Sequence, residues 1–136
     1  MSWEECVKLG MAEKRTPDEE LAKSLLKIAG ERLDFFYSKN ATIFAMEGIY
    51  EAILELSHAF LALEGLKTLS HECAIEFLRG RYLDEYETEF LQKMRKKRHG
   101  IKYYGTSVSF EILKANMEKG RVLFLKLKTV LEGKLS

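Results

Sequence analysis

The sequence predicts an all-α protein, an antiparallel up-and-down bundle of four to five helices, on three observations. The 136 residues include only one proline, with 46% apolar and 32% charged residues, which is typical of helix-rich globular chains. Several long segments place apolar residues three and four positions apart, which is the helical period. No segment alternates apolar and polar residues over the length of a strand. Since this length suffices for one buried core, we expect a single domain over 1–136.

The first part of the chain predicts a short helix followed by a long one. Residues 2–10 form the short amphipathic helix, and the bundle proper is expected to occupy 17–132. The long helix begins with Thr16 as its cap and Pro17 at the first helical position, and an acidic residue three after the cap completes a capping box. We expect this helix to run to about Ser38.

The middle of the chain predicts a widely apolar helix and then a shorter one. Residues 41–65 are apolar around more than half of a helical circumference, so this helix is expected to be central or to lie at a subunit interface. Gly65 is expected to end it, and Ser70 to cap a shorter helix that ends near Gly80. From the apolar excess we predict a two-fold homodimer, formed through parts of this helix and the next long one.

The last part of the chain predicts two more long helices with a turn between them. The fourth helix is expected over about 83–100 and the last over about 109–132, each with apolar residues at helical spacing. The glycine and small polar residues at 105–107 indicate the turn.

The charge and cysteine content indicate where in the cell the protein is located, but they do not indicate what it binds. The net charge of +1 combines 22 basic and 21 acidic residues, so only their distribution is informative. The first residues lack the pattern of a secretory signal, and charged residues interrupt every apolar stretch, so we expect a cytoplasmic protein with no membrane span. Cys6 and Cys73 are expected to be reduced and to act as small hydrophobic residues. Two asparagines and one glutamine beside abundant lysine and glutamate are typical of thermophile proteins.

One arginine lies where the pattern predicts an apolar residue. Arg98 falls within the apolar stripe of the fourth helix, and no acidic residue occurs between Arg95 and Glu111. An unpaired buried guanidinium is strongly unfavourable, so Arg98 needs a carboxylate, a partner subunit or an anionic ligand. Glu47 and Glu51 are the candidates for an internal ion pair. A bound phosphate is the other explanation, because it fits the fork of guanidinium donors.

The order of these features resembles the HEPN family (higher eukaryotes and prokaryotes nucleotide-binding). The likeness covers about 17–130, with "LAKSLLKIAGERLDFF", "YEAILELSHAFLALEG" and "SHECAIEFL" as the first three helices and "RKKRHGIKYYG" at the signature position. The signature pairs an arginine and a neighbouring polar residue with a histidine, written R-x4-6-H. Arg98 and His99 match its first two residues, whereas Tyr103 stands where the histidine would be. The resemblance implies a HEPN-like bundle similar to nucleotidyltransferase substrate-binding domains.

The resemblance also implies a function. It points to a nucleotide- or RNA-binding module that partners a minimal nucleotidyltransferase in a toxin–antitoxin-type pair, with no cofactor. His99 would add to the attraction for the ligand. The residues expected to bind phosphate or nucleic acid are Arg95, Lys97, Arg98, Lys102, Tyr103 and Tyr104.

Two alternatives stay open beside this reading. In a metal-independent RNase, Arg98 would stabilise the anionic transition state while His99 acted as the base. In a non-catalytic interaction scaffold, Arg98 would pair internally and the surrounding cations would dock an acidic partner.

Other residues with chemical potential are expected to be structural. His58 lies among leucines and is predicted to be a hydrogen-bonded core histidine. His71 and Cys73 lie two apart on a helix, so their side chains point away from each other and no metal site is predicted. Gly30 and Gly48 are isolated within helices and are expected to permit close helix packing.

Overall fold

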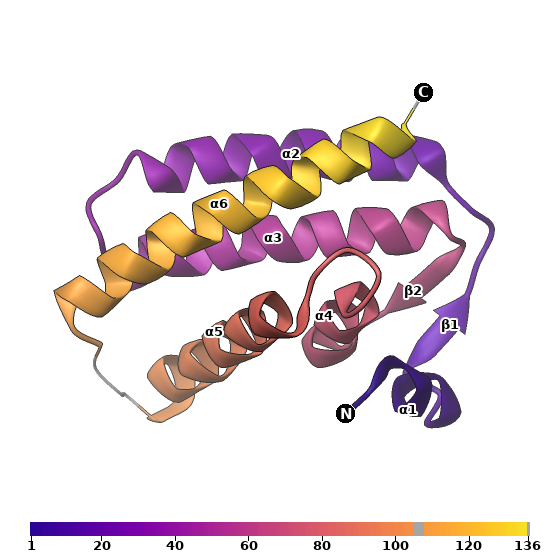
Figure 1. Ribbon diagram of the computed structural model, residues 1–136, viewed down its shortest axis with the longest axis horizontal. Helices are drawn as coiled ribbons and strands as arrows, with labels where there is room; N and C mark the ends of the chain where they lie inside the picture. Colours follow the sequence, from indigo (N-terminus) through magenta and orange to yellow (C-terminus); the bar gives the residue numbers. More distant parts are fainter. Residues whose placement is uncertain (105–107, 136) are drawn as a thin grey trace.

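The protein is mostly helical, as predicted (Figure 1). The computed structural model describes the backbone of residues 1–104 and 108–135, and the side chains of residues 1–98 and 108–135. Within these residues the all-α class is confirmed, with one small two-stranded sheet added. The elements in chain order are α1 (Trp3–Lys8), β1 (Ala12–Lys14), α2 (Glu19–Tyr37), α3 (Ile43–Leu63), β2 (Leu66–Thr68), α4 (His71–Leu78), α5 (Glu85–Tyr104) and α6 (Phe110–Lys134).

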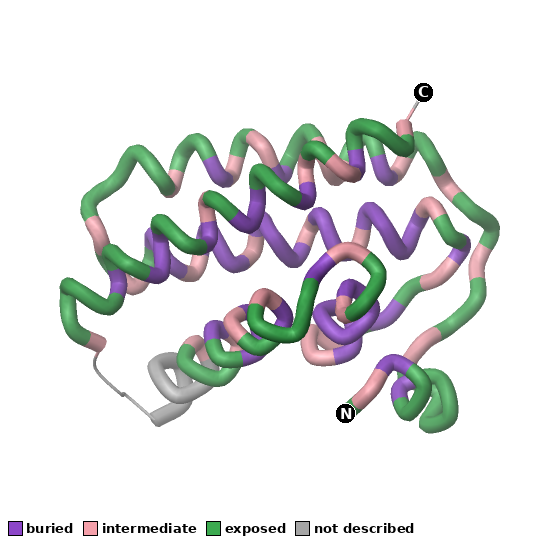
Figure 2. Tube along the Cα trace, in the orientation of Figure 1, coloured by how far each residue is buried: buried purple, intermediate pink, exposed green. Residues whose placement is uncertain are grey.

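Helix α3 is the centre of the fold. It packs against α2 and α6 along its length and also contacts α4 and α5 (Figure 1). Two thirds of its positions are buried, and Figure 2 shows buried positions along its whole length. Its apolar excess is therefore covered within one chain, as the central alternative predicted. Phe44, with 78% of its surface exposed, is the main apolar side chain that α3 leaves open, so the argument for a dimer contact through α3 is removed.

The predicted start of the first long helix is wrong by two residues. Asp18, not Thr16, caps α2, and its carboxylate accepts a hydrogen bond of 2.9 Å from the Leu21 backbone. The segment before it stays extended because it is bonded to the end of α3. The Arg15 amide donates to the Gly65 carbonyl at 2.8 Å, and the Asp18 amide donates to the Ala62 carbonyl at 2.9 Å. These long-range bonds override the local capping signal.

The other predicted boundaries agree with the structure to within a few residues, although α5 extends to Tyr104 and not only to about 100. Ser70 caps α4 as predicted, by accepting from the Cys73 backbone. Ser109, which was not predicted as a cap, caps α6 by accepting from the Ile112 backbone. Gly65 follows the end of α3 with a φ of +71°, a conformation that disfavours any side chain.

The two strands were not predicted. β1 and β2 pair antiparallel with Ala12 opposite Thr68, and they connect the N-terminal segment to the end of α3. The Thr68 hydroxyl donates a 2.6 Å hydrogen bond to the Met11 carbonyl beside this pairing. Because each strand has only three residues, neither is long enough to display alternation in the sequence.

Two glycines allow helices to approach closely. A Cβ at Gly48 would overlap the ring of Phe36 from α2, which confirms the packing role predicted for it. A Cβ at Gly120 of α6 would lie 2.8 Å from the Ile49 side chain, so this glycine has the same role without having been singled out. At Gly30 no atom lies within 4 Å of the added Cβ, and the close packing predicted there is wrong.

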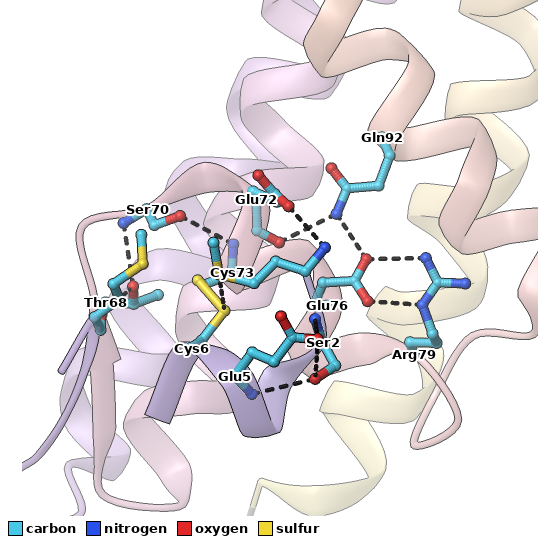
Figure 3. Close-up of a disulfide and its surroundings, with 12 residues drawn as sticks. Ser2, Glu5, Cys6, Thr68, Ser70, Glu72, Cys73, Glu76, Arg79 and Gln92 are labelled. Atoms are coloured by element: carbon cyan, nitrogen blue, oxygen red, sulfur yellow. Dashed lines mark hydrogen bonds and ion pairs between the residues drawn. A yellow bond between two sulfur atoms is a disulfide. The ribbon is translucent and has the colours of Figure 1, made fainter. Parts of the chain in front are cut away.

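The prediction of two reduced cysteines is also wrong. Cys6 of α1 and Cys73 of α4 form a disulfide, although 67 positions separate them (Figure 3). Both are fully buried because α1 packs on α4, where the rings of Trp3 and Phe77 meet edge to face at 5.0 Å. Sequence spacing carries no signal for this contact, which is created by the docking of the N-terminal helix.

Across residues 1–104 and 108–135, no helix has both the length and the apolar character required to cross a membrane.

Candidate nucleic-acid interface

The candidate residues lie on α5, whose charge changes sign along its length. The helix begins after Asp84, whose carboxylate accepts a 2.8 Å hydrogen bond from the Glu87 backbone. Leu91 and Met94 bury its inner face against the core. Acidic residues occupy the first turns and cations the later ones, which complements the helix dipole.

The first half of α5 is tied to α4 by an ion-pair network around Arg79. This guanidinium lies 2.8 Å from Glu76, 2.5 Å from Glu85 and 2.7 Å from Glu89. The Gln92 amide donates a further 2.8 Å hydrogen bond to Glu76, which Figure 3 shows between Arg79 and Gln92. Burial alone would raise the pKa of Glu76, but the hydrogen bonds from Arg79 and Gln92 outweigh it and hold that pKa below its ordinary value.

Arg98 points inward, as predicted, and it pairs with Glu51 of α3. Its Nη2 lies 3.1 Å from Glu51 Oε1, and its guanidinium carbon lies 5.9 Å from the centre of the Tyr50 ring. The side chain is 25% exposed, so the pair lies at the edge of the core. Its Nε is buried and has no hydrogen-bond acceptor within the described part of the chain. Of the two acids considered for an internal pair, the structure selects Glu51 over Glu47.

Arg95 is also engaged by neighbouring side chains. Its Nε donates a 2.7 Å hydrogen bond to Gln92, and its Nη2 lies 3.7 Å from Glu72 of α4. Glu72 in turn pairs with the N-terminal ammonium of Met1 at 3.1 Å. Arg95 therefore helps to fasten α5 to α4 and is only partly available to a ligand.

The lysines of the second half of α5 differ from these arginines because they lack ion-pair partners among the described residues. Lys93, Lys96 and Lys97 are exposed, and none of them forms an ion pair with a described residue. They form an open cationic face, called here the α5 lysine face, whereas the partly exposed Arg95 and Arg98 turn toward α4 and α3. Unpaired exposed cations on one face attract a polyanion, so this is the chemistry that the arrangement supports.

The remaining predicted binding residues follow Arg98 in the sequence. His99, Lys102, Tyr103 and Tyr104 lie outside the residues whose side chains are described. Of the predicted set, the structure describes the side chains of Arg95, Lys97 and Arg98. Arg95 and Arg98 pair with acids of α4 and α3, whereas Lys97 is exposed on the lysine face.

A tyrosine and a histidine that the sequence did not assign to the site lie beside Arg98. The Tyr50 hydroxyl of α3 and His71 Nδ1 of α4 are 3.4 Å apart. Burial is the main cause that raises the pKa of Tyr50 well above its ordinary value, and the charge of Glu51 adds to it. Since these side chains come from three different helices, no local sequence pattern could have grouped them.

The residues weighed as nucleophiles or metal ligands have structural surroundings. The Ser57 hydroxyl donates a 2.5 Å hydrogen bond to the Ala74 carbonyl, which links α3 to α4. His58 is partly buried, and burial together with the nearby His71 lowers its pKa. The hydrogen bond predicted for His58 is not found among the described residues. Within the same residues, no group of three or more His, Cys, Asp or Glu side chains is arranged to hold a metal ion.

No protein-family model matches the chain, and no curated protein and no solved structure matches it either.

Proposed function

We propose that this protein is an RNA-binding helical module whose α5 lysine face holds the phosphate backbone. The observation that carries the proposal is the set of three neighbouring exposed lysines, Lys93, Lys96 and Lys97, without carboxylate partners in the described part of the chain. In the first half of the same helix, Glu85 and Glu89 pair with Arg79, and Glu87 pairs with Lys126 of α6, so the surplus of positive charge is local. Phosphates neutralise such a surplus.

The role proposed for Arg98 follows from its ion pair. Because Glu51 occupies one side of its guanidinium, Arg98 holds a phosphate less tightly than an unpaired arginine would. We therefore assign the initial attraction to the lysine face, and a secondary contact to Arg95 and Arg98, which lie on a different side of α5. The same proposal includes a HEPN-like up-and-down bundle, a homodimer and a cytoplasmic location. It also includes a nucleotidyltransferase as the partner protein in a toxin–antitoxin-type pair. The disulfide is compatible with the predicted thermophile origin, because intracellular proteins of hyperthermophiles retain disulfides.

The test is a salt titration of RNA binding. The fluorescence anisotropy of a labelled single-stranded RNA gives the affinity of the wild type and of Lys93→Gln/Lys96→Gln/Lys97→Gln between 50 and 300 mM salt. We expect the triple variant to bind much more weakly and to lower the slope of log affinity against log salt by about 2, since each single-strand phosphate contact contributes about 0.7.

The matched control is the triple variant Lys8→Gln/Lys14→Gln/Lys27→Gln. These lysines are also exposed and without ion pairs to described residues, but they lie on α1, β1 and α2. The control removes the same net charge and should retain most of the affinity. Equal losses in the two triple variants would contradict a located binding face.

The interaction scaffold is the second candidate, favoured by the Arg98–Glu51 pair that it predicted. RNA affinity that is absent from the wild type, combined with a loss of stability in Glu51→Gln, would select the scaffold. The RNase alternative is tested by measuring cleavage of the same RNA in the presence of EDTA. Cleavage that persists there and disappears in His99→Ala would select it.

A further inference from the structure

A groove runs between α5 and α6 on the side of α5 away from Arg98. It consists of two adjoining hollows of about 370 and 200 Å³, joined because Tyr86, Phe90 and Lys119 line both. The larger hollow alone lies within the range of roughly 300–1,000 Å³ that small-molecule sites occupy. The groove thus has room for a flat ligand of the size of a nucleobase.

The floor of the groove is apolar and partly aromatic. Phe90 of α5 and Leu123 of α6 form its base, and Val122, 57% exposed, stands at its side. Tyr86 is 69% exposed, and its hydroxyl accepts a 3.2 Å hydrogen bond from the Lys119 ammonium. Exposed aromatic and aliphatic surface in a hollow favours a planar ring that stacks on it.

One polar side chain at the smaller hollow lacks a partner. Asn116 of α6 is only 9% exposed, and its Nδ2 is shielded from water without a hydrogen-bond partner among the described residues. A buried amide without a partner destabilises the fold, which makes its position here informative. A 180° rotation about χ2 exchanges the amide nitrogen and oxygen, so the side chain can offer either a donor or an acceptor.

The charge around Asn116 is positive. Lys93 and Lys97 of the α5 lysine face line the same hollow, together with Lys119. Glu89 also lines it, but this carboxylate is engaged by Arg79 at 2.7 Å. An anionic group is therefore attracted to this end of the groove, next to the apolar floor.

We propose that the groove is a nucleobase-binding subsite for the RNA held by the α5 lysine face. The base stacks against Phe90 and Tyr86, its edge hydrogen-bonds to the Asn116 amide, and its phosphate lies among Lys93, Lys97 and Lys119. The amide of asparagine pairs with base edges because it carries a donor and an acceptor side by side. This inference rests on the proposed function and adds to it a preference for bases over a bare phosphate backbone.

The test compares two labelled polymers of ten units, an oligoadenylate RNA and a ribose phosphate polymer that lacks bases. Wild type should bind the RNA at least about tenfold more tightly than the base-free polymer, as stacking plus one base-edge contact implies. Asn116→Leu should lose most of that difference while its affinity for the base-free polymer is unchanged. Lys93→Gln/Lys97→Gln should weaken both polymers alike.

Two variants together separate a loss of binding from a loss of folding. Asn116→Leu replaces an unpaired amide with an apolar side chain of similar size, so its stability should equal or exceed that of the wild type. Val122→Trp fills the groove from an exposed position, and it should abolish the same preference for bases.

Three outcomes overturn the subsite. Equal affinity of the wild type for both polymers overturns it and leaves the lysine face as a general phosphate-binding surface. A preference for bases that survives both Asn116→Leu and Val122→Trp also overturns it. Failure to bind either polymer overturns the subsite and the proposed function together.

Discussion

The two halves of α5 differ in how their charges are compensated. In the first half, Glu85 and Glu89 both pair with Arg79, which also holds the buried Glu76. In the second half, Lys93, Lys96 and Lys97 have no acidic partner among the described residues. Arg95 and Arg98 still pair with Glu72 and Glu51, so the open charge of the second half is that of its three lysines.

This difference teaches which charges are structural. Glu76 and Arg79, which hold the compensated half, lie in α4 and directly after it, and the disulfide joins α4 to the N-terminal helix (Figure 3). Removing one partner of a paired and buried charge destabilises the protein, whereas an unpaired exposed lysine contributes little to stability and is free for a ligand. Substitutions in the first half should therefore change stability, and those in the second half should change binding.

The largest effect on stability is expected from the disulfide. Replacing Cys6 and Cys73 by alanine releases a loop of 67 positions, which lowers the free energy of unfolding by about 4 kcal/mol on loop-entropy grounds. Urea unfolding measures this loss, and wild type treated with a reductant should show a similar one. A double variant as stable as the oxidised wild type would show that the disulfide between α1 and α4 does not stabilise the fold.

Breaking the Arg79 network should have the next largest effect. Arg79→Gln leaves Glu76 buried without its main partner and should cost about 2 kcal/mol, less than a fully buried pair because Arg79 is partly exposed. The lowered pKa of Glu76 means that its contribution to stability is present above about pH 4.5 and is lost as the pH falls through the lowered value. Arg79→Gln should remove this acid sensitivity.

Arg121→Gln is the control for Arg79→Gln. Arg121 pairs with Glu118 at 3.5 Å on the exposed side of α6, so its loss should cost less than about 0.5 kcal/mol. Similar losses in the two variants would mean that the Arg79 network is no stronger than a surface pair.

The Arg98–Glu51 pair is a compensated charge within the second half of α5. Glu51→Gln should lower stability by about 1 kcal/mol or less, since both side chains are partly exposed. The same change frees Arg98 and removes a negative charge, so RNA affinity should rise severalfold. Glu47→Gln is the matched control, because Glu47 lies on the same helix and pairs with no described residue. A greater rise in affinity in Glu47→Gln would contradict the role of the pair.

The smallest effect concerns His58. Burial and the neighbouring His71 hold the pKa of His58 below its ordinary value of about 6.5. The unfolded chain therefore binds the proton more readily, and stability should fall as the pH drops below about 6.5 toward the lowered pKa. In His58→Gln this part of the pH dependence should vanish, as equilibrium unfolding between pH 5 and 8 would show. An unchanged profile would assign the dependence to another group.

Much of the fold could be predicted because its signals are local. The cap at Ser70 and the stop at Gly65 depend on residues within one turn, and they agree with the structure. Thr16 carries an equally good local signal, yet it lies before the helix because backbone bonds to the end of α3 keep that segment extended. Local signals fail where a distant segment supplies the hydrogen bonds.

The candidate site could be predicted only in part. Helical periodicity alone directs Arg98 inward, and the structure confirms it. The choice of Glu51 as partner, the contact of Tyr50 with His71 and the groove at Asn116 each join residues of different helices. Such groups depend on how the helices dock, which no spacing along the chain records.

The helices, their amphipathic faces and the run of cations on α5 can be predicted from the sequence, because they follow from periodicity and composition. The packing of the helices determines which charges are compensated, which cysteines are joined and where an unpaired amide lines a groove. The physical reason is range: helix propensity and capping act over one or two turns, whereas ion pairs, disulfides and grooves require elements far apart in the chain to be packed side by side.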